Sequence, residues 1–423
     1  MTIHRFVRHL TPEDQAASRH LRLPFPYDGE GSFEVRLTYQ RGELSPLVPF
    51  PRGEGRAAAV VDLGCEGPGG WRGWSGGARE WFTICDDGAT PGYVGGGLVP
   101  GEYAVVLGLH RIPAEGVEVV VEVELPARRR PEAEGEHPPS PGREDVRERQ
   151  ATRRLPAPAG MAWYAGDFHA HSRHSDGTLP LPHLVAAGVG AGLDFLAVTE
   201  HNTVSHHALL PGLASRYGIT LIPGQEVTTH RGHANAYGDI GFVDFREPAE
   251  AWRVACEERG GLLSVNHPLQ DDCGWQYAER GHALELWHIT WFLDLMATGP
   301  WALWERWDQS LPVIGGSDFH NPDQGFPLGT PTTWVLAEED SPEALLAAVR
   351  AGRTAISLPQ ALGAGVLLRV DGELWAVGAD GAVAVDLEGQ RTVVRGERVS
   401  LGTPAGGGLV RLETPGGSLI AIG

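Results

Sequence analysis

The sequence predicts an α/β protein whose central part is built from parallel strands, with β-rich segments before and after it. Two observations predict this fold class. After residue 160, short apolar runs alternate with helical patterns, which is typical of parallel strands joined by helical crossovers. Before residue 126 and after residue 360, short alternating segments are separated by Gly and Pro turns, as in antiparallel sheets.

The N-terminal segment, residues 1–125, is expected to form a β-sandwich. Apolar and polar residues alternate in FEVRLTYQ, AAAVVDLG, YAVVLGLH and VEVVVEVEL, and such alternation places one face of each strand in a core. Residues 126–160 are rich in Pro, Arg and Glu and show almost no apolar periodicity, which predicts a linker.

The alternation of strands and helices is expected to occupy residues 161–360. The candidate helices span residues 181–192, 206–217, 248–259, 293–309 and 342–351. Residues 361–423 return to short strands with Gly turns, which predicts a small C-terminal β domain.

Length and composition limit the class of protein. The 423 residues are enough for two or three domains, and 42% hydrophobic residues suit a globular protein. The net charge is −20, so we expect no binding of a nucleic-acid polymer, which needs a basic surface. Neither a membrane span nor a leader peptide is predicted, and four cysteines without paired spacing favour a reducing cytoplasm.

Five clusters of His, Asp and Glu follow predicted strands: DFHAHSRHSDG, TEHN, PGQEVTTHRGHAN, NHP and GGSDFH. Successive side chains of an extended segment alternate sides, so His169 and His171 point the same way and can hold one cation. A lone His-x-His or Asn-His-Pro is more often a hydrogen-bonded loop. Five clusters are hard to bury unpaired, because each buried polar group would cost several kcal/mol, so the series favours a multinuclear metal site.

The order and spacing of these clusters resemble the polymerase and histidinol phosphatase (PHP) superfamily of metal-dependent hydrolases, over residues 163–358. The resemblance implies a distorted (β/α)7 barrel, with seven strands and not the usual eight. It also implies nine metal ligands, although His230 competes with His233 for one place. The nine are His169, His171, Asp176, His201, Glu226, His233, His267, Asp318 and His320.

A second resemblance concerns the N-terminal segment. GWRGWSGGARE, followed by ATPGYVGGGLVPGEYAVVLGLH, is similar to the N-terminal domain of CehA/McbA-type metallohydrolases, a PHP branch that includes carbamate hydrolases. Trp71, Trp74 and Tyr93 are interpreted as packing residues and not as a ligand platform. We expect that residues 1–125 can be deleted without loss of metal binding, because the linker separates them from all nine ligands.

Nine ligands are too many for one ion, since a catalytic zinc usually takes three or four protein ligands. Three divalent ions are therefore expected, and an imidazole-rich set favours Zn, Mn or Fe over Ca or Mg. The resemblance assigns His169, His171, Glu226 and Asp318 to the first ion, Glu226, His233 and His267 to the second, and Asp176, His201 and His320 to the third.

The charge of this site predicts its chemistry. Three dications bring +6 against −3 from Asp176, Glu226 and Asp318, which leaves a site near +3 that attracts anions. A metal-bound hydroxide is the expected nucleophile, and the ions stabilise the charge that develops on the attacked group. This chemistry suits the hydrolysis of a phosphate ester, and it suits a carbamate almost as well.

Four residues are expected to act in catalysis: Asp318, His320 and Glu226 through the metals, and Arg353 by clamping a substrate phosphate. A surface ion pair is the alternative for Arg353. Trp287 and Trp291 are expected to stack on the substrate, with packing in the core as their alternative. Further candidates are Asp167, Glu200, Asn235, Asn266 and Asn321 to orient imidazoles, and His174, His230 and His288 to protonate a leaving group.

The sequence thus predicts a cytoplasmic, metal-dependent phosphoesterase with a small, anionic substrate such as a phosphate ester or a nucleotide. A carbamate or ester hydrolase is the second hypothesis. A binding or structural module that keeps its metals without turnover is the third, and the intact ligand set disfavours it. The oligomeric state, the identity of the metals and the physiological substrate stay open.

Overall fold

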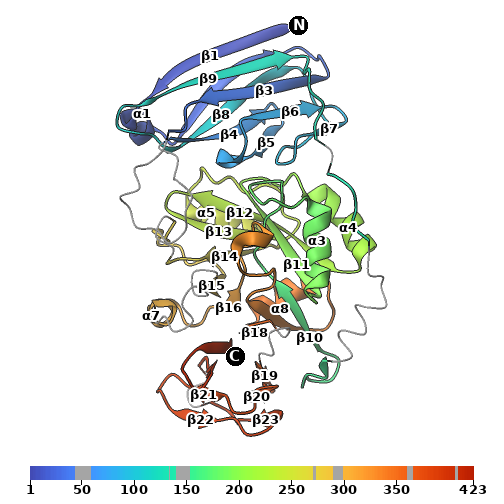
Figure 1. Cartoon of the computed structure of the whole chain (residues 1–423), viewed down its shortest axis with the longest axis vertical. Helices are drawn as coiled ribbons and strands as arrows, with labels where there is room; N and C mark the ends of the chain where they lie inside the picture. Colours follow the sequence, from blue (N-terminus) through green and yellow to red (C-terminus); the bar gives the residue numbers. More distant parts are fainter. Residues whose placement is uncertain are drawn as a thin grey trace. The chain divides into compact units, whose positions relative to one another are not determined.

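The computed structural model describes residues 1–42, 59–132, 134–139, 153–269, 273–288, 299–359, 365–404 and 408–423. The chain divides into two compact units, and Figure 1 labels many of their helices and strands. The first unit holds Met1–Gly135 and two short segments from later in the chain, Arg173–Asp176 and His201–His206. The second unit holds the remaining residues from Glu136 onward.

The first unit consists of two antiparallel sheets around one hydrophobic core. In this core the ring of Phe33 meets those of Phe25 and Tyr103 edge to face, with centroids 5.3 and 5.4 Å apart. A short helix, α1 (Pro12–Ala17), follows the first strand. One sheet has the order β1 (Thr2–Leu10), β9 (Val117–Leu125), β3 (Ser32–Tyr39), β6 (Trp81–Cys85) and β7 (Gly88–Ala89), and the other has β2 (His20–Tyr27), β8 (Gly101–Arg111), β4 (Val60–Gly67) and β5 (Gly70–Trp74).

The first unit also contains two of the nine predicted metal ligands. Asp176 and His201 lie in the two later segments that belong to this unit. The expectation that residues 1–125 stand apart from every ligand is therefore wrong. It relied on the connectivity of the chain, which does not show which later loops join the sandwich. Of the predicted linker, residues 133 and 140–152 lie outside the described residues.

One long sheet organises the second unit. Its central strands are buried along their whole length, as expected of strands that are covered on both faces. The strand order is β16 (Val313–Gly315), β15 (Ala283–Trp287), β14 (Leu262–Asn266), β13 (Gly232–Tyr237), β12 (Thr220–Thr229), β11 (Phe195–His201), β10 (Ala162–Asp167), β17 (Thr332–Ala337) and β18 (Thr354–Ser357).

The strands are not all parallel, and the prediction of a uniformly parallel sheet is wrong at two of them. β10 and β11 are parallel, as are β14, β15 and β16. β13 runs against both of its neighbours, and β17 runs against β10. Only His230 and Arg231 separate β12 from β13, and a link of two residues permits a hairpin but no helical crossover.

The edge strand β16 is joined to β17 and β18 by side chains. The Thr333 hydroxyl donates to the Gly315 carbonyl and accepts from the Gly315 amide, both at 2.8 Å. Thr354 Oγ1 donates to the Val313 carbonyl at 2.8 Å. Within the described residues no backbone ladder closes the ring at this point, so the sheet bends toward a barrel without the hydrogen-bonded closure that the sequence predicts.

The helices lie close to their predicted positions. They are α3 (Leu181–Gly190), α4 (Leu210–Tyr217), α5 (Ala249–Glu258), α7 (Gly299–Arg306) and α8 (Pro342–Arg350). α8 begins with a capping bond in which the Ser341 hydroxyl accepts from the Ala344 amide at 3.2 Å. The predicted helix at residues 293–309 falls partly outside the described residues. Among the helices that are described, none is long and apolar enough to cross a membrane.

The C-terminal residues extend the sheet of the second unit. β25 (Leu419–Ile422) pairs antiparallel with β18, and β24 (Arg411–Glu413), β21 (Val383–Val385) and β22 (Arg391–Val393) continue from it. The other strands, β19 (Val366–Val370), β20 (Glu373–Val377) and β23 (Arg398–Ser400), form a three-stranded sheet. Residues 365–423 thus belong to the second unit, where the sequence predicts a separate small domain.

Aromatic rings fill the space beside the end of β10. The ring of Phe168 lies 5.0 Å from Phe195 and 5.4 Å from Tyr237, edge to face in both cases. Gly166 is paired with Phe195 in the ladder between β10 and β11. A Cβ at Gly166 would lie 2.3 Å from the Phe195 ring, so the missing side chain makes room for that ring.

We expect Gly166→Ala to lower the free energy of unfolding by about 1–3 kcal/mol, because the fully buried Phe195 ring has no space to move. Gly190→Ala is the matched control, since a Cβ at Gly190 meets nothing within 4 Å at the end of α3. The control is expected to be neutral or to stabilise by about 0.5–1 kcal/mol. Urea unfolding measures both variants, and equal midpoints would contradict the packing argument.

Candidate metal centre

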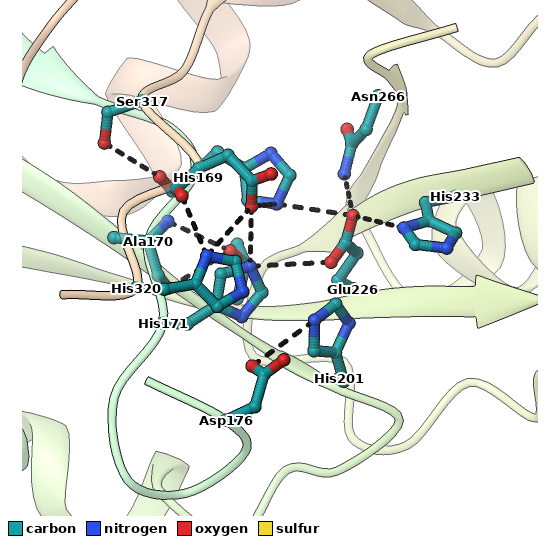
Figure 2. Close-up of polar contacts among 12 residues, drawn as sticks. His169, Ala170, His171, Asp176, His201, Glu226, His233, Asn266, Ser317 and His320 are labelled. Carbon is teal, nitrogen blue, oxygen red and sulfur yellow. Dashed lines mark hydrogen bonds and ion pairs between the residues drawn. The ribbon is translucent and has the colours of Figure 1, made fainter. Parts of the chain in front are cut away.

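Glu226 lies among four imidazoles. It is a fully buried residue of β12. Its Oε1 is 3.3 Å from His169 Nε2, 3.2 Å from His233 Nδ1 and 3.1 Å from His267 Nε2. Its Oε2 is 3.5 Å from His171 Nε2, and Figure 2 shows the contacts around this carboxylate. The four histidines come from the ends of β10 and β14 and from β13, so three separate parts of the chain meet at one group.

Asp318 is a second point of convergence. Its Oδ1 lies 3.3 Å from His169 Nε2 and 3.2 Å from His171 Nε2. These contacts place both imidazoles on one side of their segment, as the alternation of an extended chain requires. Ala170 and Phe319 form a parallel bridge, in which the His171 amide donates to the Phe319 carbonyl at 2.8 Å. The bridge explains why a His-x-His and an Asp-x-His segment face one cluster.

The backbone is strained at two of these residues. His267 has φ 23° and Asp318 has φ 49°, in a region that residues other than glycine rarely adopt. Gly316 has a related role, because a Cβ there would lie 2.3 Å from Glu285 Oε1 and 2.5 Å from the Cβ of His169. Strain and close approach at one cluster are typical of a functional site, where side-chain placement outweighs local backbone preference.

Burial and charge oppose each other in the titration of this cluster. Burial disfavours the imidazolium of His169, but Glu226, Asp318 and Glu285 outweigh burial and raise its pKa well above the usual value. The pKa of His267 is raised in the same way, against burial, by its contacts with Cys273 and Glu226. Burial disfavours the Asp318 carboxylate, but His169 and His320 hold its pKa well below the usual value.

The donor set fits a divalent ion. One ligand atom from each of His169, Glu226, His267 and Asp318 lies within 4.8 Å of the others. His169 Nε2 lies 3.3 Å from both Glu226 Oε1 and Asp318 Oδ1, and His267 Nε2 lies 3.1 Å from Glu226 Oε1. These separations are close to the edge of a tetrahedron whose centre lies roughly 2.0–2.1 Å from each corner, as in a zinc site. In the described structure, His169 Nε2 and Asp318 Oδ1 are buried without a hydrogen bond, which a coordinated ion would explain.

A cysteine adjoins the same cluster. Cys273 Sγ lies 3.4 Å from His267 Nδ1, on the side of the ring opposite the nitrogen that faces Glu226. The thiol can therefore fix the orientation of His267 without competing for its Nε2 atom. His230 is exposed while His233 reaches Glu226, so the geometry favours His233 over its competitor.

The remaining predicted ligands are His320, Asp176 and His201. His320 Nδ1 lies 2.8 Å from the Asp318 carbonyl oxygen, and its ring stacks on that of His171 at 4.3 Å. In the first unit, His201 Nε2 lies 3.5 Å from Asp176 Oδ1. The predicted third group combines this pair with His320 of the second unit, and it stays a prediction.

Glu285 is a functional candidate that the sequence analysis missed. Its Oε1 lies 3.0 Å from His169 Nδ1, and its Oε2 accepts the backbone amide of His267 at 2.8 Å. One buried carboxylate thereby orients two predicted ligands. One feature of the sequence could have identified it. Glu285 is the single acid of the apolar strand ALELW, and an acidic side chain is almost never fully buried unless it is paired.

The bonds of the five predicted orienting residues reach backbone atoms, hydroxyl groups or a carboxylate. Asp167 accepts the amides of His169, Ser317 and Gly329 at 3.1, 3.0 and 2.7 Å. Asn266 Nδ2 donates to Glu226 Oε1 at 3.0 Å. The others act on the backbone nearby: Glu200 accepts the Ser172 amide, Asn235 donates to the Phe168 carbonyl, and Asn321 caps the 3-10 helix η3 (Pro322–Gln324).

Arg353 lies at the wrong end of the sheet for a phosphate clamp. It precedes β18, where Thr354 pairs with Val335, and Val335 pairs with Tyr164 near the start of β10. The metal ligands follow the opposite end of β10. The guanidinium contacts Glu338 at 3.2 and 3.4 Å, which is the surface ion pair left open as its alternative. β18 runs in the same direction as β10, so a residue that precedes β18 lies at the end of the sheet where β10 begins.

Trp287 lies in a hydrophobic cluster with Trp301 and Trp304, and its side chain is fully buried. This position agrees with the packing alternative, and a role in substrate binding stays a prediction. Trp291 lies outside the described residues.

The three histidines proposed as proton donors differ in their surroundings. His174 contacts Glu134 through Nε2 at 2.8 Å and Ser205 through Nδ1 at 2.7 Å, so both ring nitrogens are engaged. Burial lowers the pKa of His288 to about 3, which leaves it neutral near pH 7 and unsuited to donate a proton. His230 is exposed in the β12–β13 turn.

Comparison with known proteins gave structural similarities only. No protein-family model and no curated protein matches the chain. Similar solved structures include a two-domain protein from Bacteroides vulgatus that contains a predicted PHP-like metal-dependent phosphoesterase. Its sequence identity to this chain is 22% and the TM-score is 0.39, and the match covers 63% of this chain and 96% of that chain. A candidate metal-dependent phosphoesterase from Bifidobacterium adolescentis has 16% identity, coverages of 39% and 90%, and a TM-score of 0.30. An amidohydrolase from Chromobacterium violaceum, with bound sulfate and no metal, has 19% identity, coverages of 46% and 98%, and a TM-score of 0.31.

We expect Glu285→Gln to weaken metal binding by about 10–100-fold, because the imidazole of His169 loses its charged partner. Competition with a chromophoric chelator measures the affinity. Glu279→Gln is the matched control, since Glu279 bonds to Arg253 and not to a predicted ligand. An unchanged affinity in Glu285→Gln would remove this residue from the metal centre.

We expect metal binding to release protons near pH 7 and to weaken as the pH falls. The raised pKa values of His169 and His267 mean that the metal-free protein holds protons which an ion must displace. The folding stability of the metal-free protein depends on pH in the opposite direction. Its imidazolium–carboxylate contacts stabilise the fold fully below about pH 6.5, and this stabilisation is lost as the pH rises through the raised pKa values of the two histidines. Calorimetry in buffers of different ionisation enthalpy counts the protons, and a count of zero would contradict the assignment.

Proposed function

We propose that this protein is a metal-dependent hydrolase that acts on small phosphate esters. One observation carries the proposal. Buried His, Glu and Asp donors from separate strand ends meet at distances that suit ligands of shared ions, and the backbone is strained at His267 and Asp318 to place them. A cluster that served only the fold would not need this strain.

The proposed centre holds three divalent ions, of which Zn, Mn or Fe suit the imidazole-rich donors. The contacts of Glu226 and Asp318 support the first two groups of ligands. The third group has the support of the contact between His201 and Asp176. We assign His169, His171, Glu226 and Asp318 to the first ion, Glu226, His233 and His267 to the second, and Asp176, His201 and His320 to the third.

Bound ions of this kind supply an acidified water for attack and positive charge for the departing oxygen. The protein's own residues prepare the site for them. Glu285 holds His169 through Nδ1 and Cys273 adjoins Nδ1 of His267, so each ring directs Nε2 toward Glu226. Exposure rises from 0% at His169 to 13% at Asp318 and 27% at His320, which marks the side that a substrate can reach.

The charge balance supports a phosphate ester over a neutral carbamate. Three dications contribute +6, and the carboxylates of Asp176, Glu226, Asp318 and Glu285 contribute −4, so the site remains near +2. A positive site gains most from a substrate that is already anionic and whose transition state spreads negative charge over several oxygens. A neutral carbamate would use less of this charge.

The test is a comparison of kcat/KM for a nitrophenyl phosphate monoester, a nitrophenyl phosphate diester, nucleoside monophosphates and an aryl methylcarbamate. Mn and Zn are supplied separately to protein stripped of metal. We expect a phosphate ester to be the best substrate. Asp318→Asn, which keeps the side-chain volume and loses the charge, is expected to reduce its turnover about 100-fold or more, with an unchanged circular dichroism spectrum.

Two outcomes would reject the proposal. If the carbamate is hydrolysed at least about 100-fold better than every phosphate ester, a difference near 2.7 kcal/mol, the protein is a carbamate hydrolase. Tight metal binding without turnover of any of these substrates would instead favour a binding or structural module.

A further inference from the structure

The two segments that carry Asp176 and His201 are held by residues of the sandwich. Both segments belong to the first unit, and residues 173–176 and 202–206 form turns and extended loop without strand or helix. Trp71 of β5 donates from Nε1 to the carbonyl of Asn202 at 2.9 Å, one residue after His201. Asn202 is buried and has φ 52°, so this bond fixes a strained backbone beside a predicted ligand.

Gly92 joins the two segments. Its carbonyl accepts from Thr203 Oγ1 at 2.7 Å, and its amide donates to Ser205 Oγ at 3.2 Å. The same amide lies 3.4 Å from His174 Nδ1, which contacts Ser205 Oγ at 2.7 Å. Gly92 has φ 101°, and a Cβ there would lie 2.8 Å from the His174 carbonyl oxygen. Only glycine fits between these segments.

Arg79 holds the other segment through its backbone. Its guanidinium donates to the carbonyl of Ser175 at 3.1 Å and to that of Arg173. Ser175 directly precedes Asp176, so the bond restricts the direction of the Asp176 side chain. Two carbonyls bound by one planar guanidinium cannot rotate independently.

We propose that Trp71, Arg79 and Gly92 are positioning residues that set Asp176 and His201 to bind a divalent metal ion. The proposal rests on the three-ion site proposed above. Metal binding is expected to depend on these bonds because they position the two side chains. Without the bonds, His201 Nε2 and Asp176 Oδ1 would no longer be held 3.5 Å apart.

The experiment uses the full chain with Trp71→Phe, which keeps the ring and removes the donor, and Arg79→Gln. Trp81→Phe is the matched control, because Trp81 belongs to the sandwich strand β6 and bonds to neither segment in the described contacts. Elemental analysis after equilibration with excess Zn and removal of unbound ions counts the ions, and hydrogen exchange follows peptides covering 173–176 and 201–206. Thermal unfolding checks that each variant is folded.

We expect the Trp71 and Arg79 variants to lose one ion of three, or to bind the weakest ion about 10–100-fold less tightly, with faster exchange in those peptides. The Trp81 control should match the wild type, and Arg79→Lys should recover part of the loss. Unchanged ion counts in folded Trp71→Phe and Arg79→Gln would overturn the proposal, as would a wild type that binds no third ion. Since ions are counted without substrate, an inactive wild type that loses an ion in these variants would reject the phosphoesterase but keep this inference.

Discussion

The second unit depends on the burial of the Glu226 carboxylate among four imidazoles. A carboxylate without water costs several kcal/mol unless charges or hydrogen-bond donors compensate it. Glu226 gains His169, His171, His233 and His267 within 3.1–3.5 Å, and these residues come from three separate parts of the chain. The ends of β10 and β14 and the start of β13 must therefore meet beside Glu226.

Strain is concentrated at this rim and is supported by a rigid frame. His267 and Asp318 adopt positive φ directly after β14 and shortly after β16, strands whose residues are all buried. A packed strand cannot shift to relax its last residues, so it can hold a backbone conformation that would cost roughly 1–3 kcal/mol in isolation. The glycine at 316 acts with this strain, because it allows Glu285 to approach His169.

The sequence was sufficient for features with a local cause. The side on which His169 and His171 lie follows from alternation, and the helices follow from their periodicity. It was insufficient where position depends on the partner of a strand. Glu285 and Cys273 reach ligand imidazoles through space, and the level of Arg353 in the sheet follows from the pairing of β18 with β17 and of β17 with β10. The extra antiparallel strand β13 had one signal, the short link at His230 and Arg231.

The candidate ligands differ in how firmly the fold holds them. Glu226 is part of a ten-residue strand that pairs with β13, and Asn266 also bonds to its carboxylate. Asp176 lies in a turn and His201 at the very end of β11, and side-chain bonds from Trp71, Thr203 and Arg79 anchor these segments. Because ladder hydrogen bonds break cooperatively and single side-chain bonds break one at a time, we expect the segments of Asp176 and His201 to fluctuate more than the strand that carries Glu226. We therefore expect an ion held by Asp176 and His201 to exchange faster than one held by Glu226.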